Sequence, residues 1–399
     1  MSSTRGHSRQ PAPRRLSPAV YRRRRLAVSG VTILLIAMLV LIIWLATDGG
    51  SPRKNTASSS TTTTTPVPAT GIGLRTVTWT DTNPDAGLVV NPLSGGSAGP
   101  RTLITDIWYP SMSRSKSAAA PGAKPDYRGG PFPVVVFAHG FDTLPSTYMP
   151  LLDSWVRAGF VVVAPLFPDE NANEISSLGN VTVTQREVAE SDVVYEPYDI
   201  AYVVGKVEAA AAGVASTGAG WLKGLAEPGR VALAGHSDGA EAVAALVYSN
   251  KYASTYETMA PKPFAVIILS GSTLTGTYGP PASAPPALFV QSAVDECNLP
   301  QNASALLHDI GGGFFLKLAQ AGHFSPYVGQ GAAAPVVEEV TITFLKEALT
   351  GTPSYSVLSA SITSSGIATL YPPATPPALT ALTPPSQAGL LEACAVPGT

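Results

Sequence analysis

The sequence predicts an α/β fold, in which a mostly parallel central sheet of about eight strands carries helices on both faces and no large cap domain. From about Gly71 onward, short β-branched runs alternate with longer stretches of helical character. Six of these runs are apolar nearly throughout, as expected for parallel strands that are buried on both faces. One N-terminal transmembrane helix is predicted to precede this domain.

The N-terminus has the pattern of a membrane anchor. Residues 1–25 carry eight arginines and no acidic residue, and residues 26–46 form an uncharged, almost wholly apolar run. A helix of these 21 residues would be about 31 Å long, enough to cross the hydrocarbon core. Because the arginines precede the span, we expect the basic segment in the cytoplasm and the rest of the chain outside the cell membrane.

A signal peptide that is cleaved, with secretion of the domain, is the alternative for this region. The apolar run is longer than the roughly 7–15 residues of a secretory core region. Bulky Trp44 also stands where a cleavage site before Ala46 would need a small residue. The run Arg22–Arg25 leaves a twin-arginine export signal open, but the strongly apolar segment favours retention in the bilayer.

The charge balance argues against a nucleic-acid partner. Without the eight N-terminal arginines, 17 basic residues stand against 27 acidic ones, so the rest of the chain is acidic. Nucleic-acid binding and a surface-lying helix are weaker interpretations of the basic segment, because the adjacent apolar span already accounts for it. Residues 47–70, rich in Ser, Thr and Pro, are expected to be a linker.

Local patterns within residues 71–350 predict the elements of the globular domain. The polar segment 166–192 is expected to be either a loop over the cleft or a surface excursion. Residues 351–399 form a C-terminal extension rich in Pro, Thr and Ala, in which 354–361 would add an edge strand or pack on the domain. The expected strands are Leu74–Thr80, Leu103–Tyr109, Pro133–Ala138, Phe160–Ala164, Val231–Ala234, Ala265–Leu269, Ala287–Gln291 and Phe314–Leu318, and the expected helices are Met149–Ala158, Tyr198–Ala212, Ala240–Tyr248, Gln301–Asp309 and Pro335–Leu349.

The sharpest motif is Gly235-His236-Ser237-Asp238-Gly239, which fits G-x-S-x-G. It lies between an expected strand and an expected helix, the context in which a sharp turn projects a nucleophilic serine. A purely structural turn is the alternative, but this context favours Ser237 as a nucleophile. The helix N-terminus at Ser237 would also favour a developing anion.

His323 is the predicted base for this serine. It lies in Gly322-His323-Phe324, just past an expected strand and therefore at the carboxyl edge of the sheet, where Ser237 also emerges. A lone histidine is often only a structural residue, but this position favours a catalytic one. The other histidines have less suitable positions. His7 lies in the basic segment, His139 in another loop, His236 in the motif itself and His308 in an expected helix.

Asp295 is the predicted acid that orients the imidazole, with the adjacent Glu296 as the alternative. It also follows an expected strand, and the chain order Ser237, Asp295, His323 is the order of Ser, Asp and His in α/β-hydrolases. A solvated loop aspartate is the structural alternative. For the oxyanion of an acyl-transfer site, we expect the backbone N–H groups of Phe141, which follows another strand, and of Asp238 as donors.

Cys297 and Cys394 are the chain's two cysteines, and no spacing typical of a metal site is present. In an oxidising exterior they could form a disulfide, which would stabilise the fold by roughly 2–4 kcal/mol. Two free thiols are the alternative. The disulfide is favoured because it would hold the loop that carries Asp295.

The chain resembles the α/β-hydrolase superfamily, and within it the group of dienelactone hydrolases, chlorophyllases, platelet-activating-factor acetylhydrolases and bacterial polyester hydrolases. The resemblance covers residues 101 to about 350. Its motifs are specific for the superfamily but do not identify the subgroup. Asp238 departs from the pattern, because polyester hydrolases usually carry methionine there, and a carboxylate would disfavour the oxyanion unless it turns away or pairs with a cation. The matching pieces are IWYP at Ile107–Pro110, PVVVFAHGF, AGFVVVAP, GHSDGA, the Asp295 loop and Gly322-His323-Phe324.

This resemblance implies a serine esterase that acts through an acyl-enzyme and needs no cofactor or metal. The expected partners are a small-molecule or lipid-like ester and, through the N-terminal helix, the membrane. An envelope acyltransferase, a serine peptidase and a non-catalytic surface-binding protein on a hydrolase scaffold are the alternatives.

Overall fold

The computed structural model describes residues 71–82, 100–115, 118–179, 182–363, 366–373, 375 and 377–396. All of them belong to one compact unit, Thr64–Thr399. The predicted basic segment, membrane span and linker, at 1–25, 26–46 and 47–70, lie outside the described residues and stay predictions. Within the described ranges, no helix combines the length and the apolar composition needed to cross a membrane.

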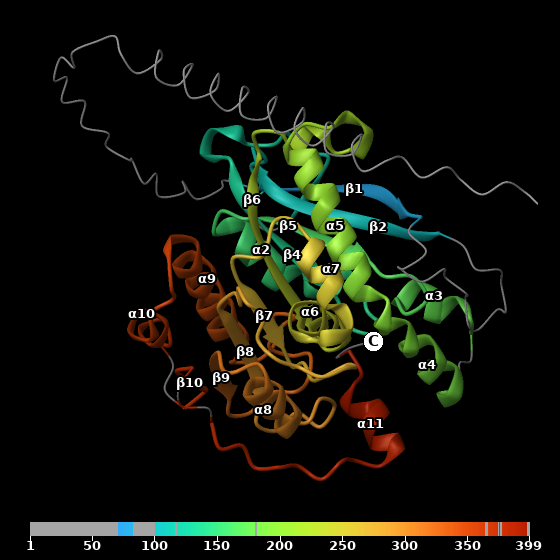
Figure 1. Ribbon diagram of the computed structural model, residues 1–399, viewed down its shortest axis with the longest axis vertical. Helices are drawn as coiled ribbons and strands as arrows, with labels where there is room; N and C mark the ends of the chain where they lie inside the picture. The colour runs from blue at the N-terminus through green and yellow to red at the C-terminus, as the bar shows by residue number, and fades with distance from the viewer. Residues whose placement is uncertain are drawn as a thin grey trace, which may run out of the picture. The chain divides into compact units, whose positions relative to one another are not determined.

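A mixed sheet of ten strands forms the centre of the described fold, in the order β10-β9-β8-β7-β6-β4-β5-β2-β1-β3 (Figure 1). The predicted α/β architecture with a large central sheet is therefore confirmed. Strands β5, β4, β6, β7, β8 and β9 pair in parallel, whereas β2 and β10 join this block in antiparallel orientation. Each expected run is a strand, and the short strands β3 and β10 add to them. The strands are β1 Gly71–Asp81, β2 Arg101–Ser111, β3 Ala120–Pro121, β4 Phe132–Ala138, β5 Val161–Leu166, β6 Ala226–His236, β7 Val266–Leu269, β8 Ala287–Ser292, β9 Phe314–Leu318 and β10 Ala368–Tyr371.

The apolar strands are explained by burial on both faces of the sheet. In β4, Val134 and Val136 pack into the core on one face, whereas Val135 and Phe137 pack into the core on the other. Successive side chains of a strand point to opposite faces, so a strand covered on both sides needs apolar residues at every position.

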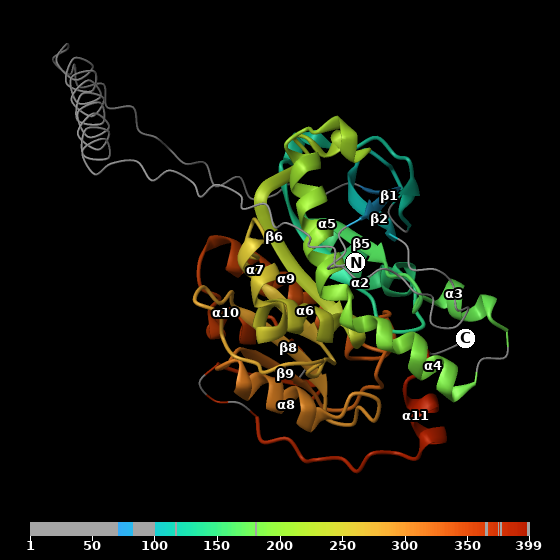
Figure 2. The same ribbon diagram turned by 45° about the vertical axis from the view of Figure 1, so that its right-hand side comes forward.

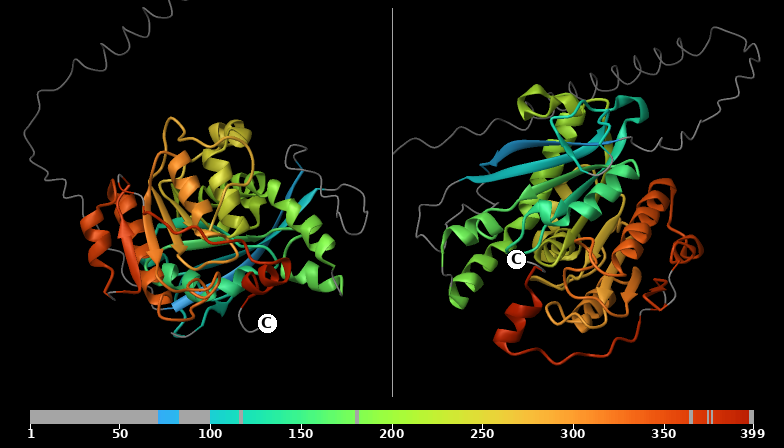
Figure 3. Two further views of the ribbon diagram at one scale, coloured as in Figure 1. Left: turned by 90° about the horizontal axis from the view of Figure 1, so that it is seen from below. Right: turned by 180° about the vertical axis from the view of Figure 1, so that it is seen from behind.

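Helices cover both faces of the sheet (Figure 3). Buried side chains of α5, α6 and α8 belong to one core, and those of α2, α9 and α10 to the other. The helices of the described residues are α2 Met149–Arg157, α3 Ala172–Ser177, α4 Val183–Glu190, α5 Glu196–Ala211, α6 Asp238–Tyr248, α7 Ala253–Thr258, α8 Pro300–Asp309, α9 Ala334–Thr350, α10 Tyr355–Ala360 and α11 Gln387–Ala393.

The C-terminal extension is part of this fold, and here one expectation is wrong. Residues 354–361 form the short helix α10 instead of an edge strand, and the edge strand is β10, which pairs with β9. The chain then passes α8, where the side-chain amide of Gln301 exchanges two hydrogen bonds with the backbone of Leu382, and ends in α11 (Figure 2).

The segment between β5 and α5 is not a simple loop, because it contains α3 and α4.

A buried ion cluster joins the antiparallel end of the sheet to the helical layer. Arg101, at the start of β2, is fully buried and contacts Asp192 and Asp199 through two forked pairs of hydrogen bonds at 2.6–3.0 Å. Burial alone would lower the pKa of Arg101, but the two carboxylates outweigh it and raise that pKa. The guanidinium therefore stays charged and compensates two carboxyl groups that are buried almost completely.

Candidate active site

The residues of the predicted site follow neighbouring parallel strands at one edge of the sheet. Ser237 follows β6, Asp295 lies three residues after β8, and His323 lies five residues after β9. The loop that begins at His139 follows β4, which is the neighbour of β6 on the other side. Carboxyl ends of parallel strands meet at the same edge, which is where α/β proteins bind their ligands.

Ser237 lies in a strained turn between β6 and α6. Its φ and ψ are 53° and −123°, and its backbone N–H donates to the carbonyl of Leu269 at 3.0 Å. A Cβ at Gly235 would overlap the backbone of Gly239, and a Cβ at Gly239 would overlap the carbonyl groups of Ala138 and His139. Both glycines of the motif are therefore required for α6 to start so close to the sheet.

Ser237, His323 and Asp295 are connected by hydrogen bonds. The Nε2 atom of His323 lies 3.0 Å from the Oγ atom of Ser237, and its Nδ1 atom lies 3.0 and 3.2 Å from the two carboxylate oxygens of Asp295. Their exposed fractions are 7%, 3% and 0%. This arrangement allows the imidazole to remove the serine proton and the carboxylate to stabilise the imidazolium that results.

The carboxylate of Asp295 is held by further donors. Its Oδ1 atom accepts hydrogen bonds from the backbone N–H groups of Cys297 and Asn298, each at 3.0 Å, and Oδ2 accepts one from Nε2 of Gln291 at 3.2 Å. These bonds compensate a buried charge and fix the direction of the carboxyl group. This role of Gln291 was not predicted from the sequence, although Gln291 is the polar residue of an otherwise apolar run, and that was the available signal.

The loop after β4 lies against the serine. A Cβ at Gly140 would be 3.0 Å from the Cβ of Ser237, so any larger residue would push the loop and the serine apart. Among the described residues, the backbone N–H groups of Phe141 and Asp238 donate to no acceptor. Both groups are therefore free to donate, and their predicted role as oxyanion donors stays a prediction.

The orientation of the Phe141 N–H group is set by its own peptide unit. The carbonyl of Gly140 accepts hydrogen bonds from Nδ1 of His139 at 2.9 Å and from Oγ1 of Thr143 at 2.5 Å. The C=O and N–H groups of a trans peptide point in opposite directions, so holding the Gly140 carbonyl fixes the direction of the Phe141 N–H. His139 is neutral, because burial lowers its pKa to about 4 and its Nε2 accepts from the N–H of Phe167 at 3.0 Å.

The segment 166–192 packs on this loop. The N–H of Asp142 donates to the carbonyl of Glu170 at 2.8 Å, and Arg186 of α4 forms an ion pair of 2.7 Å with the carboxylate of Asp142. The guanidinium of Arg186 also lies 5.1 Å from the ring centroid of Phe141. The segment thus packs against the loop after β4, and its predicted place over a cleft stays a prediction.

Buried carboxyl groups surround Asp238. Burial, together with Glu170, Glu241 and Glu190, raises the pKa of Asp238 well above its usual range. Glu170 and Glu196 are fully buried, and their carboxyl groups receive no hydrogen bond from another described residue. They can form a hydrogen bond with each other only if one of them is protonated. Burial raises the pKa of Glu170 to about 8. The raised pKa of Asp238 favours its neutral form, and a neutral carboxyl does not repel an oxyanion.

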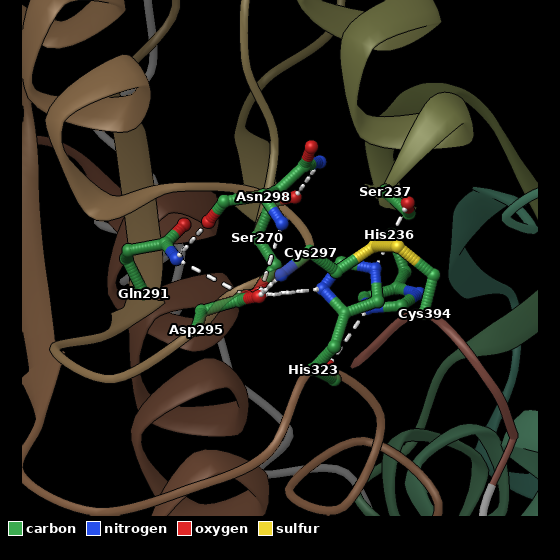
Figure 4. The surroundings of a disulfide bond; sticks show 9 residues. All are labelled: His236, Ser237, Ser270, Gln291, Asp295, Cys297, Asn298, His323 and Cys394. Carbon is green, nitrogen blue, oxygen red and sulfur yellow. Dashed lines mark hydrogen bonds and ion pairs between the residues drawn. A yellow bond between two sulfur atoms is a disulfide. The ribbon is translucent and has the colours of Figure 1, made fainter. Parts of the chain in front are cut away.

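Cys297 and Cys394 form a disulfide with a Cα–Cα distance of 5.0 Å (Figure 4). It connects the C-terminal end of α11 to the loop of Asp295, where the N–H of Cys297 itself donates to the carboxylate. The C-terminal extension is therefore attached covalently two residues from the predicted catalytic acid.

Comparison with solved structures gives a likeness in fold. A ferulic acid esterase from Streptomyces cinnamoneus aligns with a TM-score of 0.52 and 20% sequence identity, over 73% of this chain and 95% of that one. The mixed α/β architecture with its large central sheet fits the α/β-hydrolase fold. No protein-family model and no curated protein matches the sequence.

Proposed function

We propose that this chain is a serine hydrolase that cleaves carboxylic esters through an acyl-enzyme intermediate. The observation that carries the proposal is the continuous hydrogen-bonded line from Ser237 through His323 to Asp295, on a serine held at positive φ. The likeness in fold to a protein described as a ferulic acid esterase supports ester chemistry in general terms.

In this mechanism the Oγ atom of Ser237 attacks the ester carbonyl while its proton passes to Nε2 of His323. Asp295 accepts the Nδ1–H bond and stabilises the imidazolium. The oxyanion of the tetrahedral intermediate accepts hydrogen bonds from the N–H groups of Phe141 and Asp238. His323 then protonates the departing alkoxide, which leaves an acyl group on Ser237. Water that gives its proton to His323 attacks this acyl group and releases the acid.

We also propose that the enzyme acts outside the cytoplasm, attached to the membrane by residues 26–46. The disulfide supports an oxidising compartment, because cytosolic proteins seldom keep such bonds. Protease added to intact cells should release the domain by cutting within 47–70. Protection of the domain in intact cells, with cleavage after lysis, would refute the outward orientation.

Labelling with a fluorophosphonate probe tests the catalytic assignment. We expect strong labelling of the wild type, none of Ser237→Ala and little of His323→Ala, and hydrolysis of short p-nitrophenyl esters should follow the same order. Asp295→Asn should lower kcat by up to about 10⁴-fold, because the imidazole loses the partner that orients it. Labelling of Ser237→Ala at the wild-type level would remove Ser237 from the mechanism.

The same preparation separates ester hydrolysis from the alternatives. A hydrolase releases acid at a rate that added alcohol acceptors hardly change, whereas an acyltransferase makes new ester at the expense of acid. A matched pair of ester and amide substrates distinguishes an esterase from a peptidase. We expect acid release from small or lipid-like esters.

A further inference from the structure

We infer that Tyr148 and His236 are positioning residues that hold the main chain of His323 in place relative to the loop after β4. This inference rests on the proposed function, because it gives the two residues a role in placing the base. Neither belongs to the proton-transfer line, and both are fully buried.

Three consecutive hydrogen bonds form a bridge beneath the site. The N–H of Gly140 donates to the phenolic oxygen of Tyr148 at 3.2 Å, this oxygen lies 2.9 Å from Nδ1 of His236, and Nε2 of His236 lies 3.1 Å from the carbonyl oxygen of His323. The bridge therefore joins the loop after β4, the serine turn and the loop after β9, three segments far apart in sequence.

The chemistry of the groups fixes the proton positions along this bridge. A carbonyl oxygen only accepts, so Nε2 of His236 must carry the proton that bonds to His323. Burial and the neighbouring His323 lower the pKa of His236, so its ring is neutral and its Nδ1 is a bare acceptor. The hydroxyl of Tyr148 donates a hydrogen bond to Nδ1 of His236, and its oxygen accepts a hydrogen bond from the N–H of Gly140. Each donor thus meets one acceptor, in a single tautomer.

His323 needs such support because it lies in a loop, five residues beyond the end of β9. Asp295 holds its side chain, whereas His236 holds its main chain and packs against its ring with centroids 4.5 Å apart. A displacement of a catalytic group by about 1 Å can lower the rate by about 100-fold. Loss of the bridge should therefore lower kcat and leave KM nearly unchanged.

Plain core packing is the competing explanation, and substitutions that keep or remove the donor distinguish the two. His236→Leu removes both hydrogen bonds, whereas His236→Gln keeps an N–H donor at about the position of Nε2. Tyr148→Phe removes a single oxygen atom. Thr341→Val is the matched control, because it removes a buried hydrogen bond of 2.9 Å to Trp155 between α2 and α9.

The measurement is kcat per serine titrated with a fluorophosphonate, so that misfolded protein is not counted, with KM and the melting temperature measured in parallel. We expect kcat to fall about 10- to 100-fold in His236→Leu and about 5- to 10-fold in Tyr148→Phe. His236→Gln should recover most of the loss, and Thr341→Val should lower the melting temperature without changing kcat.

The inference is overturned if Tyr148→Phe keeps the wild-type kcat, or if His236→Gln loses as much activity as His236→Leu. It is equally overturned if Thr341→Val lowers kcat per titrated serine as much as the bridge variants do, since destabilisation would then explain every loss. Failure of the proposed function looks different, because the wild type itself would then show no labelling or hydrolysis that depends on Ser237.

Discussion

Substitution of Thr143 by valine should weaken the oxyanion site without touching any group of the proton-transfer line. The hydroxyl of Thr143 is one of two donors that hold the Gly140 carbonyl, and the side chain is 1% exposed. Valine has nearly the same shape, so the change leaves the packing almost intact and removes this hydrogen bond, together with the weaker 3.4 Å contacts of the hydroxyl to His139 and Tyr148. His139 keeps the second hydrogen bond, so the peptide loses part of its support.

The expected magnitude follows from the hydrogen bond that is lost. A neutral hydrogen bond of this kind contributes about 0.5–1.5 kcal/mol net. If the Phe141 N–H is correctly oriented only while both donors are present, kcat falls by up to about 10-fold, since 1.36 kcal/mol corresponds to a factor of ten. Complete loss of an oxyanion donor costs about 10²–10³-fold and sets the upper limit. KM should stay nearly constant, because the oxyanion forms only in the transition state.

The assay is hydrolysis of p-nitrophenyl acetate, with kcat normalised to fluorophosphonate-titrated serine. Thr143→Ser is the control, because it keeps the hydroxyl and loses a methyl group, and it should stay within about 2-fold of the wild type. A Thr143→Val enzyme with the wild-type kcat would refute the reasoning. Equal losses in both variants would attribute the effect to packing.

Three further predictions concern charge and stability. Burial and neighbouring carboxyl groups raise the pKa of Asp238 in the folded state, so the free energy of unfolding should fall as the pH rises above about 4, where this carboxyl ionises in the unfolded chain. Asp238→Asn removes the carboxyl and should lose less free energy of unfolding than the wild type over the same rise in pH, and parallel pH profiles for both proteins would contradict this. Cys394→Ser should lower the free energy of unfolding by about 2–4 kcal/mol in urea, and a reductant should lower that of the wild type by a similar amount but leave the variant unchanged. Arg101→Met leaves two carboxyl groups buried without their cation and should cost about 3–5 kcal/mol in the same measurement, whereas a loss below about 1 kcal/mol would show that the ion cluster is dispensable.

The sequence by itself determined eight of the ten strands of the sheet and the order of the candidate catalytic residues. Runs such as 133–138 must be apolar at every position because both faces of β4 are covered, so the pattern is visible locally. Ser237, Asp295 and His323 each follow such a run, and parallel pairing brings the ends of the strands to one edge. The proximity of these three residues at one edge of the sheet was therefore predictable from the sequence.

Tertiary structure alone decided what surrounds those residues. Tyr148 and His236 are 88 positions apart and share a hydrogen bond, and no periodicity of either segment reveals that the two side chains meet. The same holds for the edge strand β10, whose choice over 354–361 depends on which segment can reach β9. Buried polar groups must find partners wherever packing supplies them, so their pairing is a property of the assembled fold and not of any local stretch of chain.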